Sequence, residues 1–301
     1  MGLKFFDLFA GIGGFRLGME RAGHQCIGSC EWDKHARETY KTNFGSYPEY
    51  NDAKDLHPQS LPYFDVLCAG FPCQAFSIAG KRMGFEDTRG TVFFEIARIA
   101  KEKRPPYLFL ENVKGLLNHD KGRTFDTIIS TLDEMGYDAE WQVLNSKYFV
   151  PQNRERVFII GHLRGERTRQ VFPLGDFDEI SDKKKLRKEE LSRSRSHSSA
   201  IDANYYKGPD EKRTLVYMSN TNANMKQREQ ERTETWTLGT STDFGIREGM
   251  RIRKLTPKEC ERLQGFPDDW TIGSDTQRYK QCGNAVTVNV VEYIAKELRL
   301  G

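Results

Sequence analysis

The first half of the chain alternates short apolar runs with longer amphipathic stretches. The apolar runs predict strands, and the stretches whose apolar residues recur every three or four positions predict helices. The predicted helices are at about 14–22, 34–43, 89–103 and 122–135, and the predicted strands are Leu3–Phe9, His24–Cys30, Asp65–Ala69, Tyr107–Leu110 and Arg156–Gly161. Strands that alternate with helices typically form a parallel sheet covered by helices. We therefore expect an α/β fold with a doubly wound, mostly parallel sheet.

The composition changes near residue 163. From there to about residue 250 the chain is polar, only weakly periodic, and rich in Lys, Arg, Ser, Asn and Thr. Near the end, apolar residues at 288, 291, 294, 295 and 298 have helical spacing, which predicts a helix over 286–298 that packs on the first domain. With 301 residues, the chain is long enough for one large domain and a smaller one.

Charge and cysteine content narrow the class of protein. Lys and Arg exceed Asp and Glu by only 46 − 43 = 3, so the net charge alone does not indicate a nucleic-acid partner. Asp7 interrupts the apolar start that a signal peptide needs, and no run approaches the roughly 18 apolar residues of a membrane span, so we expect a cytoplasmic protein without a membrane partner. The six cysteines include no Cys-x-x-Cys pair, so we predict free thiols and no metal site.

A glycine-rich segment, Phe9-Ala10-Gly11-Ile12-Gly13-Gly14-Phe15, lies between the first predicted strand and the first helix. Glycines at such a turn let the backbone approach a ligand closely. Arg16 stands where the dinucleotide-binding fingerprint has its third glycine, which disfavours a pyrophosphate ligand. Glu31, after the second strand, can accept both ribose hydroxyls, and Trp32 offers a face to adenine. The segment predicts an adenosine-containing cofactor, with an ordinary strand–helix turn as the alternative.

Cys73 follows directly after the strand Asp65–Ala69, at the edge where doubly wound sheets bind their ligands. The next strand ends in Glu111-Asn112, and Arg154 and Arg156 stand at the start of the strand after that. A lone cysteine is more often a buried apolar residue, and simple ion pairing would explain Glu111 with an arginine. Ion pairing would not explain a thiol at the same edge, so the combination indicates a catalytic site.

Taken in order, these segments resemble the motif set of the bacterial cytosine-5 DNA methyltransferases of restriction-modification systems. Residues 253–267 are similar to the last motif of that family before its terminal helix. The other matching segments are Phe9–Phe15, Phe71-Pro72-Cys73-Gln74, Glu111-Asn112-Val113, Gln152-x-Arg154-x-Arg156 and Gly283-Asn284-Ala285-Val286. The matches run from residue 5 to 295 in the order of the family and leave out only the polar middle region.

The resemblance implies a DNA (cytosine-5-)-methyltransferase that uses S-adenosyl-L-methionine. Cys73 would add to C6 of a cytosine rotated out of duplex DNA, so that C5 can accept a methyl group. Glu111 would hydrogen-bond or protonate N3. Arg154 and Arg156 would hold the cytosine O2 and the region of the nucleophile, in an order that the sequence does not assign. A base, usually water in this family, would then remove the C5 proton as Cys73 leaves.

Further roles follow from the same resemblance. Asp52 would accept a hydrogen bond from the adenine amino group, and residues 77–90 would form a mobile loop that closes over the flipped base. The cofactor would be bound by Phe9, Ala10, Gly11, Gly13, Gly14, Glu31, Trp32, Asp52, Pro72, Asn284 and Val286. DNA would be contacted by Ser77, Lys81, Arg82, Gln152, Thr237 and Leu238.

The family also implies a division into domains. Residues 1–173 plus 283–301 would form the catalytic and cofactor-binding domain, and residues 174–282 a small target-recognition domain across a DNA cleft. In the small domain the segment 235–239 resembles the Thr-Leu recognition signature of the family, with 214–216 as a rival. The basic stretch 183–195 is a candidate for phosphate contacts, and on charge alone it is more simply a solvated loop or helix face. We expect a monomer that acts on double-stranded DNA beside a cognate restriction endonuclease.

Three alternatives remain open at this point. An RNA cytosine methyltransferase would share these motifs, but it usually carries a Cys-Phe-Thr triplet near the arginine motif that is absent here. A DNA-binding protein without catalysis would not need Cys73 and Glu111. An NAD-dependent enzyme is disfavoured by Arg16.

Overall fold

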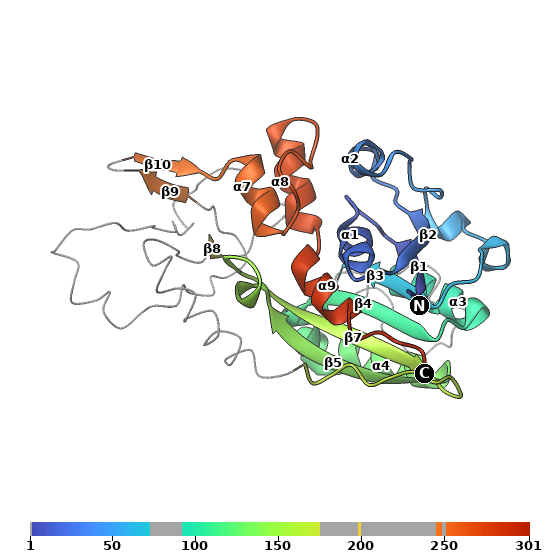
Figure 1. Cartoon of the computed structure of the whole chain (residues 1–301). Helices are drawn as coiled ribbons and strands as arrows, with labels where there is room; N and C mark the ends of the chain where they lie inside the picture. Colours follow the sequence, from blue (N-terminus) through green and yellow to red (C-terminus); the bar gives the residue numbers. More distant parts are fainter. Residues whose placement is uncertain (1, 73–91, 175–197, 200–244, 249–250) are drawn as a thin grey trace, which may run out of the picture. The chain divides into compact units, whose positions relative to one another are not determined.

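A computed structural model gives the structure of the chain and describes residues 2–72, 92–174, 198–199, 245–248 and 251–301 (Figure 1). The chain forms two compact units. Unit 1 contains Met1–Leu144, Glu155–Leu174 and Val290–Gly301, and unit 2 contains Asn145–Arg154 and Gly175–Asn289. Unit 2 therefore includes a short early segment, 145–154, that carries part of the arginine motif.

The core of unit 1 is a six-stranded sheet in the order β2-β1-β3-β4-β7-β5 (Figure 1). Three neighbouring pairs, β1–β2, β1–β3 and β3–β4, are parallel, and β4–β7 is antiparallel. The strands are β1 Lys4–Leu8, β2 Gln25–Cys30, β3 Val66–Gly70, β4 Tyr107–Val113, β5 Tyr137–Asn145 and β7 Glu155–Leu163. The structure confirms all five predicted strands and adds β5.

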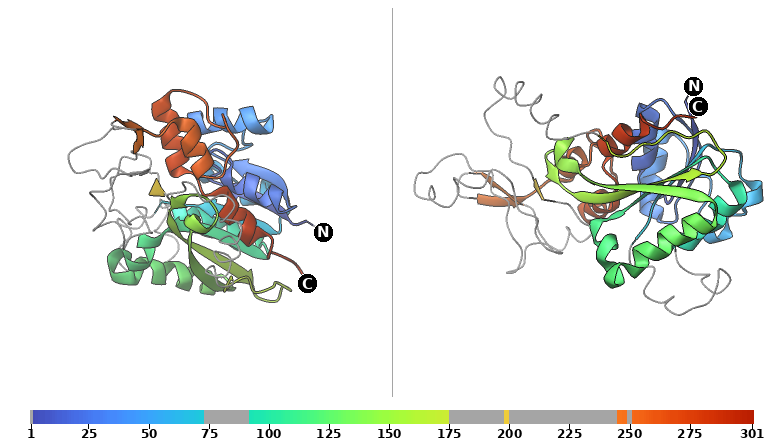
Figure 2. Two further views of the ribbon diagram at one scale, coloured as in Figure 1. Left: turned by 60° about the vertical axis from the view of Figure 1, so that its left-hand side comes forward. Right: turned by 90° about the horizontal axis from the view of Figure 1, so that it is seen from below.

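Helices cover both faces of this sheet, because successive side chains of a strand point to opposite faces. Leu108 and Leu110 of β4 belong to a core that includes Ile96 of α3 (Val92–Lys103) and Ile128 of α4 (Arg123–Glu134). Phe109 points the other way, and its ring lies 5.0 Å from that of Phe15 in α1 (Gly14–Arg21). Figures 1 and 2 show the helices on the two sides of the sheet. The predicted fold, a doubly wound and mostly parallel α/β sheet, is confirmed.

Unit 1 contains several further helical elements. Helix α2 (Lys34–Phe44) begins after Asp33, whose side chain accepts hydrogen bonds from the backbone N–H groups of His35 and Ala36, and it ends at Gly45 in the left-handed region. Residues 290–295 of α9 (Val288–Ala295) also belong here, within the predicted range 286–298. Three 3₁₀ segments are η1 Ala53–Asp55, η2 Pro58–Ser60 and η4 Lys114–Gly122.

Unit 2 has its own small core, which contains Leu255, Cys260, Leu263, Tyr279 and Cys282. Two helices supply most of it: α7 (Pro257–Leu263), which begins with a capping box at Thr256, and α8 (Asp275–Asn284). The other elements of unit 2 are η5 Ser146–Tyr148, β6 Gln152–Asn153, β8 Ser198–Ser199, β9 Gly245–Glu248 and β10 Arg251–Lys254. Within the described ranges, no helix of the chain is long and apolar enough to cross a membrane.

Candidate active site

The loop after β1 has an unusual backbone. Phe9, Gly11 and Gly13 all have positive φ angles, of 64°, 56° and 85°. A Cβ on Gly11 would meet no atom within 4 Å, whereas a Cβ on Gly13 would lie 2.3 Å from the Phe44 ring. The loop is thus packed against α2 at Gly13 and open at Gly11, where a ligand can approach the backbone.

Glu31, directly after β2, holds this loop. One carboxylate oxygen accepts the Gly11 N–H at 2.7 Å, and the other accepts the Asp33 N–H at the same distance. The side chain is largely buried, and burial raises the pKa of Glu31 in spite of these hydrogen bonds. Each oxygen keeps a second lone pair, so the carboxylate can still accept hydrogen bonds from ligand hydroxyls.

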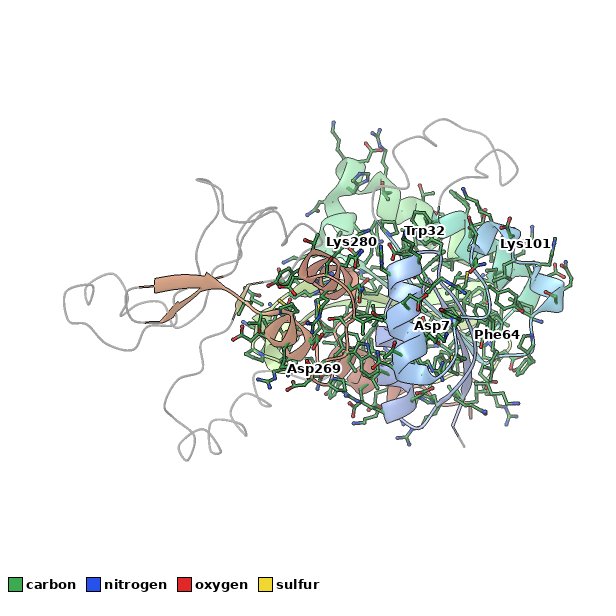
Figure 3. The ribbon with its side chains drawn as sticks, turned by 90° about the horizontal axis from the view of Figure 1, so that it is seen from above. Asp7, Trp32, Phe64, Lys101, Asp269 and Lys280 are labelled. Carbon is green, nitrogen blue, oxygen red and sulfur yellow. The ribbon has the colours of Figure 1, made fainter. Side chains whose placement is uncertain are left out.

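Two further predicted cofactor residues are Trp32, which follows Glu31 in the chain, and Asp52. Trp32 is 78% exposed, so its indole face is open to a ligand (Figure 3). Asp52 precedes η1 and accepts the Lys54 N–H at 3.0 Å. A parallel bridge between Cys30 and Tyr50 brings the segment of Asp52 to the end of β2.

Asp7, near the end of β1, is a residue that the predicted site did not include. It is fully buried, one oxygen accepts the Arg16 N–H at 3.2 Å, and within the described ranges the other oxygen has no hydrogen-bond partner. Burial raises the pKa of Asp7 to about 8. A carboxyl inside an apolar strand was the sequence signal that could have indicated this role. Asp7 supports the first turn of α1 and hence the end of the glycine loop.

Glu111 and Arg156 form an ion pair between β4 and β7, with 3.0 Å between Oε1 and Nε. Both side chains are mostly buried, and burial lowers the pKa of Arg156 against the opposing effect of Glu111. The end of β3 is close by, since a Cβ on Gly70 would lie 3.3 Å from the second Glu111 oxygen. An acid and a guanidinium therefore lie together at the carboxyl end of β4.

Asn112 ties the segment after β3 to the same place. Its amide donates to the Phe71 carbonyl at 2.8 Å, and the Phe71 N–H donates to the Glu111 carbonyl at 3.3 Å. Asn112 is buried, whereas Pro72 is exposed. The chain is thus anchored two residues before Cys73. The predicted residues Cys73, Ser77, Lys81, Arg82, Thr237 and Leu238 lie outside the described residues.

The other predicted residues belong to unit 2. Gln152 is fully buried and donates to the Leu263 carbonyl at 2.6 Å, so its side chain connects two segments of that unit. Its predicted contact with DNA stays a prediction. Arg154 is also buried and donates to the Gly283 and Ala285 carbonyls at 3.1 and 3.0 Å. These carbonyls flank Asn284, which is exposed, and precede Val286, which is buried.

The described cysteines are all free thiols. Burial raises the pKa of Cys26 and Cys30 to about 12, and it also raises the pKa of Cys68, Cys260 and Cys282. A buried thiol with a raised pKa is a poor nucleophile. In the described ranges, no group of three or more His, Cys, Asp or Glu residues is arranged to hold a metal ion.

Solved structures share the mostly parallel sheet of this chain. The Dnmt2 methyltransferase of S. pombe matches it with a TM-score of 0.65 and 17% identity over 97% of this chain and 96% of that chain. A putative DNA modification methyltransferase encoded in an E. coli prophage matches with a TM-score of 0.60 and 21% identity over 98% of both chains. At these identities the two structures establish the fold.

Sequence comparison establishes the family. The model of the C-5 cytosine-specific DNA methylases matches residues 3–299, and the chain belongs to this family. The type II methyltransferase M.HhaI of Haemophilus parahaemolyticus is 39% identical over 98% of this chain and 93% of its own length. M.HpaII of Haemophilus parainfluenzae is 42% identical over 98% of this chain and 88% of its own length. The protein is therefore a DNA cytosine-5 methyltransferase, as the motif order predicts.

Proposed function

We propose that the chain transfers a methyl group from S-adenosyl-L-methionine to C5 of a cytosine that is rotated out of duplex DNA, with Cys73 as the nucleophile. The observation that carries this proposal is the Glu111–Arg156 ion pair at the carboxyl end of β4. Asn112 anchors the chain at Phe71 beside that pair, two residues before Cys73. Glu111, Arg156 and the segment that leads to Cys73 thus lie together at one edge of the sheet.

The chemistry needs a nucleophile and a way to draw charge from the ring. The Cys73 thiolate forms a bond from Sγ to C6, and the electron pair of the C5–C6 double bond becomes available at C5. Glu111 hydrogen-bonds or protonates N3, which spreads the negative charge that builds up in the ring. S-adenosyl-L-methionine, when bound, would supply the electrophilic methyl group, which would bond to C5 with S-adenosyl-L-homocysteine as the leaving group. Loss of the C5 proton to water then restores the double bond and breaks the bond from C6 to Sγ.

The two arginines take different parts in this proposal. Arg156 contacts Glu111 and is therefore the arginine that we assign to the cytosine O2. Arg154 donates to two backbone carbonyls on either side of Asn284, so we assign it to holding that turn. The described cysteines have raised pKa values, which supports Cys73 as the thiol that reacts.

The residues around the glycine loop fit an adenosine-containing methyl donor. Glu31 would accept hydrogen bonds from the ribose hydroxyls, Trp32 would stack on adenine, and Asp52 would accept a hydrogen bond from the adenine amino group. The open space over Gly11 supports this fit, as does the 78% exposure of Trp32. The backbone of Phe9, Ala10, Gly13 and Gly14 would line the same site, and Pro72, Asn284 and Val286 complete the set that we propose.

For recognition, we propose that residues 174–282 read the DNA target, with Thr237 and Leu238 at the signature and Gln152 contributing. Ser77, Lys81 and Arg82 would contact the strand that holds the flipped base. The relatives at about 40% identity are type II methyltransferases. We infer a modification enzyme that protects DNA from a cognate endonuclease and acts as a monomer on DNA in the bacterial cytoplasm.

Radioactive methyl transfer to duplex DNA and to tRNA tests the proposal. We expect Cys73→Ala to abolish transfer to DNA and to keep DNA binding, because only the nucleophile is lost. The isosteric Glu111→Gln should keep cofactor binding and lose most turnover. Cys26→Ala is the matched control, since Cys26 has a raised pKa and no assigned role. Transfer to tRNA alone would favour the RNA alternative, and an active Cys73→Ala variant would remove the proposed nucleophile.

A further inference from the structure

A pocket rich in arginine lies in unit 1, away from the residues discussed so far. It has a volume of about 500 Å³ and is lined by Arg167, Thr168, Arg169, Arg299, Leu300 and Gly301. The lining contains three guanidinium groups and no Asp or Glu side chain. All three arginines are exposed. A concave surface with three cations favours an anionic ligand.

The pocket is built from two segments that are far apart in the sequence. Thr168 and Leu300 form an antiparallel bridge, and the Gly301 N–H donates to the Arg167 carbonyl at 2.8 Å. Figures 1 and 2 show the C-terminal end of the chain beside the segment that follows β7. The three arginines therefore lie on a fixed backbone, which holds them together in the absence of a ligand.

Tyr107 fastens both segments to the sheet. Its ring is fully buried at the start of β4, and its hydroxyl donates to the Arg299 carbonyl at 2.6 Å and accepts the Arg169 N–H at 2.7 Å. One buried hydroxyl thus connects the backbones of two arginines from the two segments that line the pocket. Such preorganisation lowers the cost of binding a ligand.

The side chains of these arginines form no ion pair with an Asp or Glu side chain among the described residues. Elsewhere among the described residues, exposed arginines pair with carboxylates, as Arg164 does with Asp133 and Asp138. In the described ranges the Arg167 and Arg169 side chains form no hydrogen bond or ion pair, and Arg299 donates only to the Lys296 carbonyl at 3.5 Å. A terminal carboxylate on Gly301 would offset one charge and leave two. Guanidinium groups without protein partners bind phosphate in a bidentate manner.

We propose that this pocket binds phosphate groups of the DNA backbone outside the target site. The proposal goes beyond the methylation chemistry, because the pocket lies at the opposite end of β4 from Glu111. Tyr107 and Glu111 are four residues apart, which corresponds to about 13 Å along a strand. A duplex segment other than the one that holds the flipped cytosine would therefore reach it. The contact would be independent of base sequence, since it involves phosphates alone.

The salt dependence of binding to a long duplex without the target site measures this contact. Each phosphate neutralised contributes a slope of about −0.9 to the logarithm of affinity against the logarithm of salt concentration. We expect the triple variant R167Q/R169Q/R299Q to reduce the steepness of that slope by about 2 to 3. The charge-preserving variant R167K/R169K/R299K should keep the slope, and Arg164→Gln is the control for an exposed arginine whose charge is already paired.

Two further measurements separate this proposal from others. Methyl transfer at saturating bacterial DNA should stay within about twofold of the wild type in the triple Gln variant, so the proposed catalytic function can hold while this site fails. Calorimetric titration with inorganic pyrophosphate tests a free phosphate compound as the source. Binding of pyrophosphate with an unchanged DNA slope would overturn DNA as the ligand, and an unchanged slope without pyrophosphate binding would overturn the phosphate site altogether.

Discussion

Alanine substitution at two glycines of the cofactor loop should affect two different properties. At Gly13, alanine must adopt a φ of 85°, and its Cβ would lie 2.3 Å and 2.8 Å from two carbons of the Phe44 ring. The left-handed conformation costs about 1–2 kcal/mol, and overpacking costs about 1–3 kcal/mol. We expect Gly13→Ala to lower the free energy of unfolding by about 2–5 kcal/mol.

Gly11→Ala is the matched partner. Its φ is 56°, and its Cβ would meet nothing within 4 Å, so only the conformational cost of about 1–2 kcal/mol applies. That methyl group, however, would enter the space where we propose that the methyl donor binds. We therefore expect Gly11→Ala to be the more stable variant and to bind S-adenosylhomocysteine at least about tenfold more weakly than the wild type, a loss of roughly 1.4 kcal/mol.

Urea denaturation and calorimetric titration with S-adenosylhomocysteine measure the two effects. The Phe44 ring packs against Tyr40, with 4.6 Å between ring centroids, and the Arg16 guanidinium lies 4.1 Å from its centroid. Moving the ring away from Gly13 would therefore lose these contacts. In a double-mutant cycle, the Phe44→Ala substitution should reduce the loss of unfolding free energy caused by Gly13→Ala by about 1 kcal/mol or more. Equal destabilisation of the two glycine variants, or no coupling to Phe44, would refute the reasoning.

Three other perturbations test single contacts. Asp7→Asn should remove a pH dependence of stability, because the pKa of Asp7 is about 8 in the folded protein and near 3.8 in the unfolded chain. The free energy of unfolding of the wild type should therefore fall between about pH 4 and pH 8, by up to about 1.4 kcal/mol per pH unit. Denaturation at pH 5 and pH 8 should show a smaller change in the variant. His24 gives a pH dependence of the opposite sign, because burial lowers its pKa below 6.5 and its neutral ring accepts the Leu3 N–H. Wild-type stability should fall as the pH drops below 6.5, and a His24→Asn variant with the same response to acid would contradict this. Asn112→Ala removes the hydrogen bond to the Phe71 carbonyl, so single-turnover methylation should slow about tenfold or more at unchanged cofactor affinity. A variant that only loses stability would show that Asn112 has a purely structural role.

Much of the fold follows from periodicity alone. The strands that became β1, β2, β3, β4 and β7 are apolar runs, so their positions could be predicted. Strand β5 lacks such a run, because Asp138, Glu140 and Gln142 interrupt it at the edge of the sheet. The antiparallel direction of β7 was also not predictable, since strand direction depends on the path of the chain and not on local composition. Helices α7 and α8 were not among the predicted helices.

The site was predictable in its residue types but not in its contacts. Motif order indicated Glu111 and both arginines, whereas only the packing of β7 beside β4 shows that Arg156 forms an ion pair with Glu111. The sequence could not show that Gln152 is buried, because a polar side chain can face either solvent or a carbonyl group in the interior. The role of Asp7 depends on burial, which composition does not give.

The measurement that tests the central claim most directly is covalent trapping. A duplex that carries 5-fluorocytosine at the target, once bisulfite sequencing has identified that target, cannot lose the C5 substituent as a proton, so the bond from Sγ to C6 should persist after methyl transfer. We expect mass spectrometry to find the modified DNA linked to Cys73 only when S-adenosyl-L-methionine is present. Methylation without any adduct, or an adduct at a different cysteine, would contradict the assignment of the nucleophile.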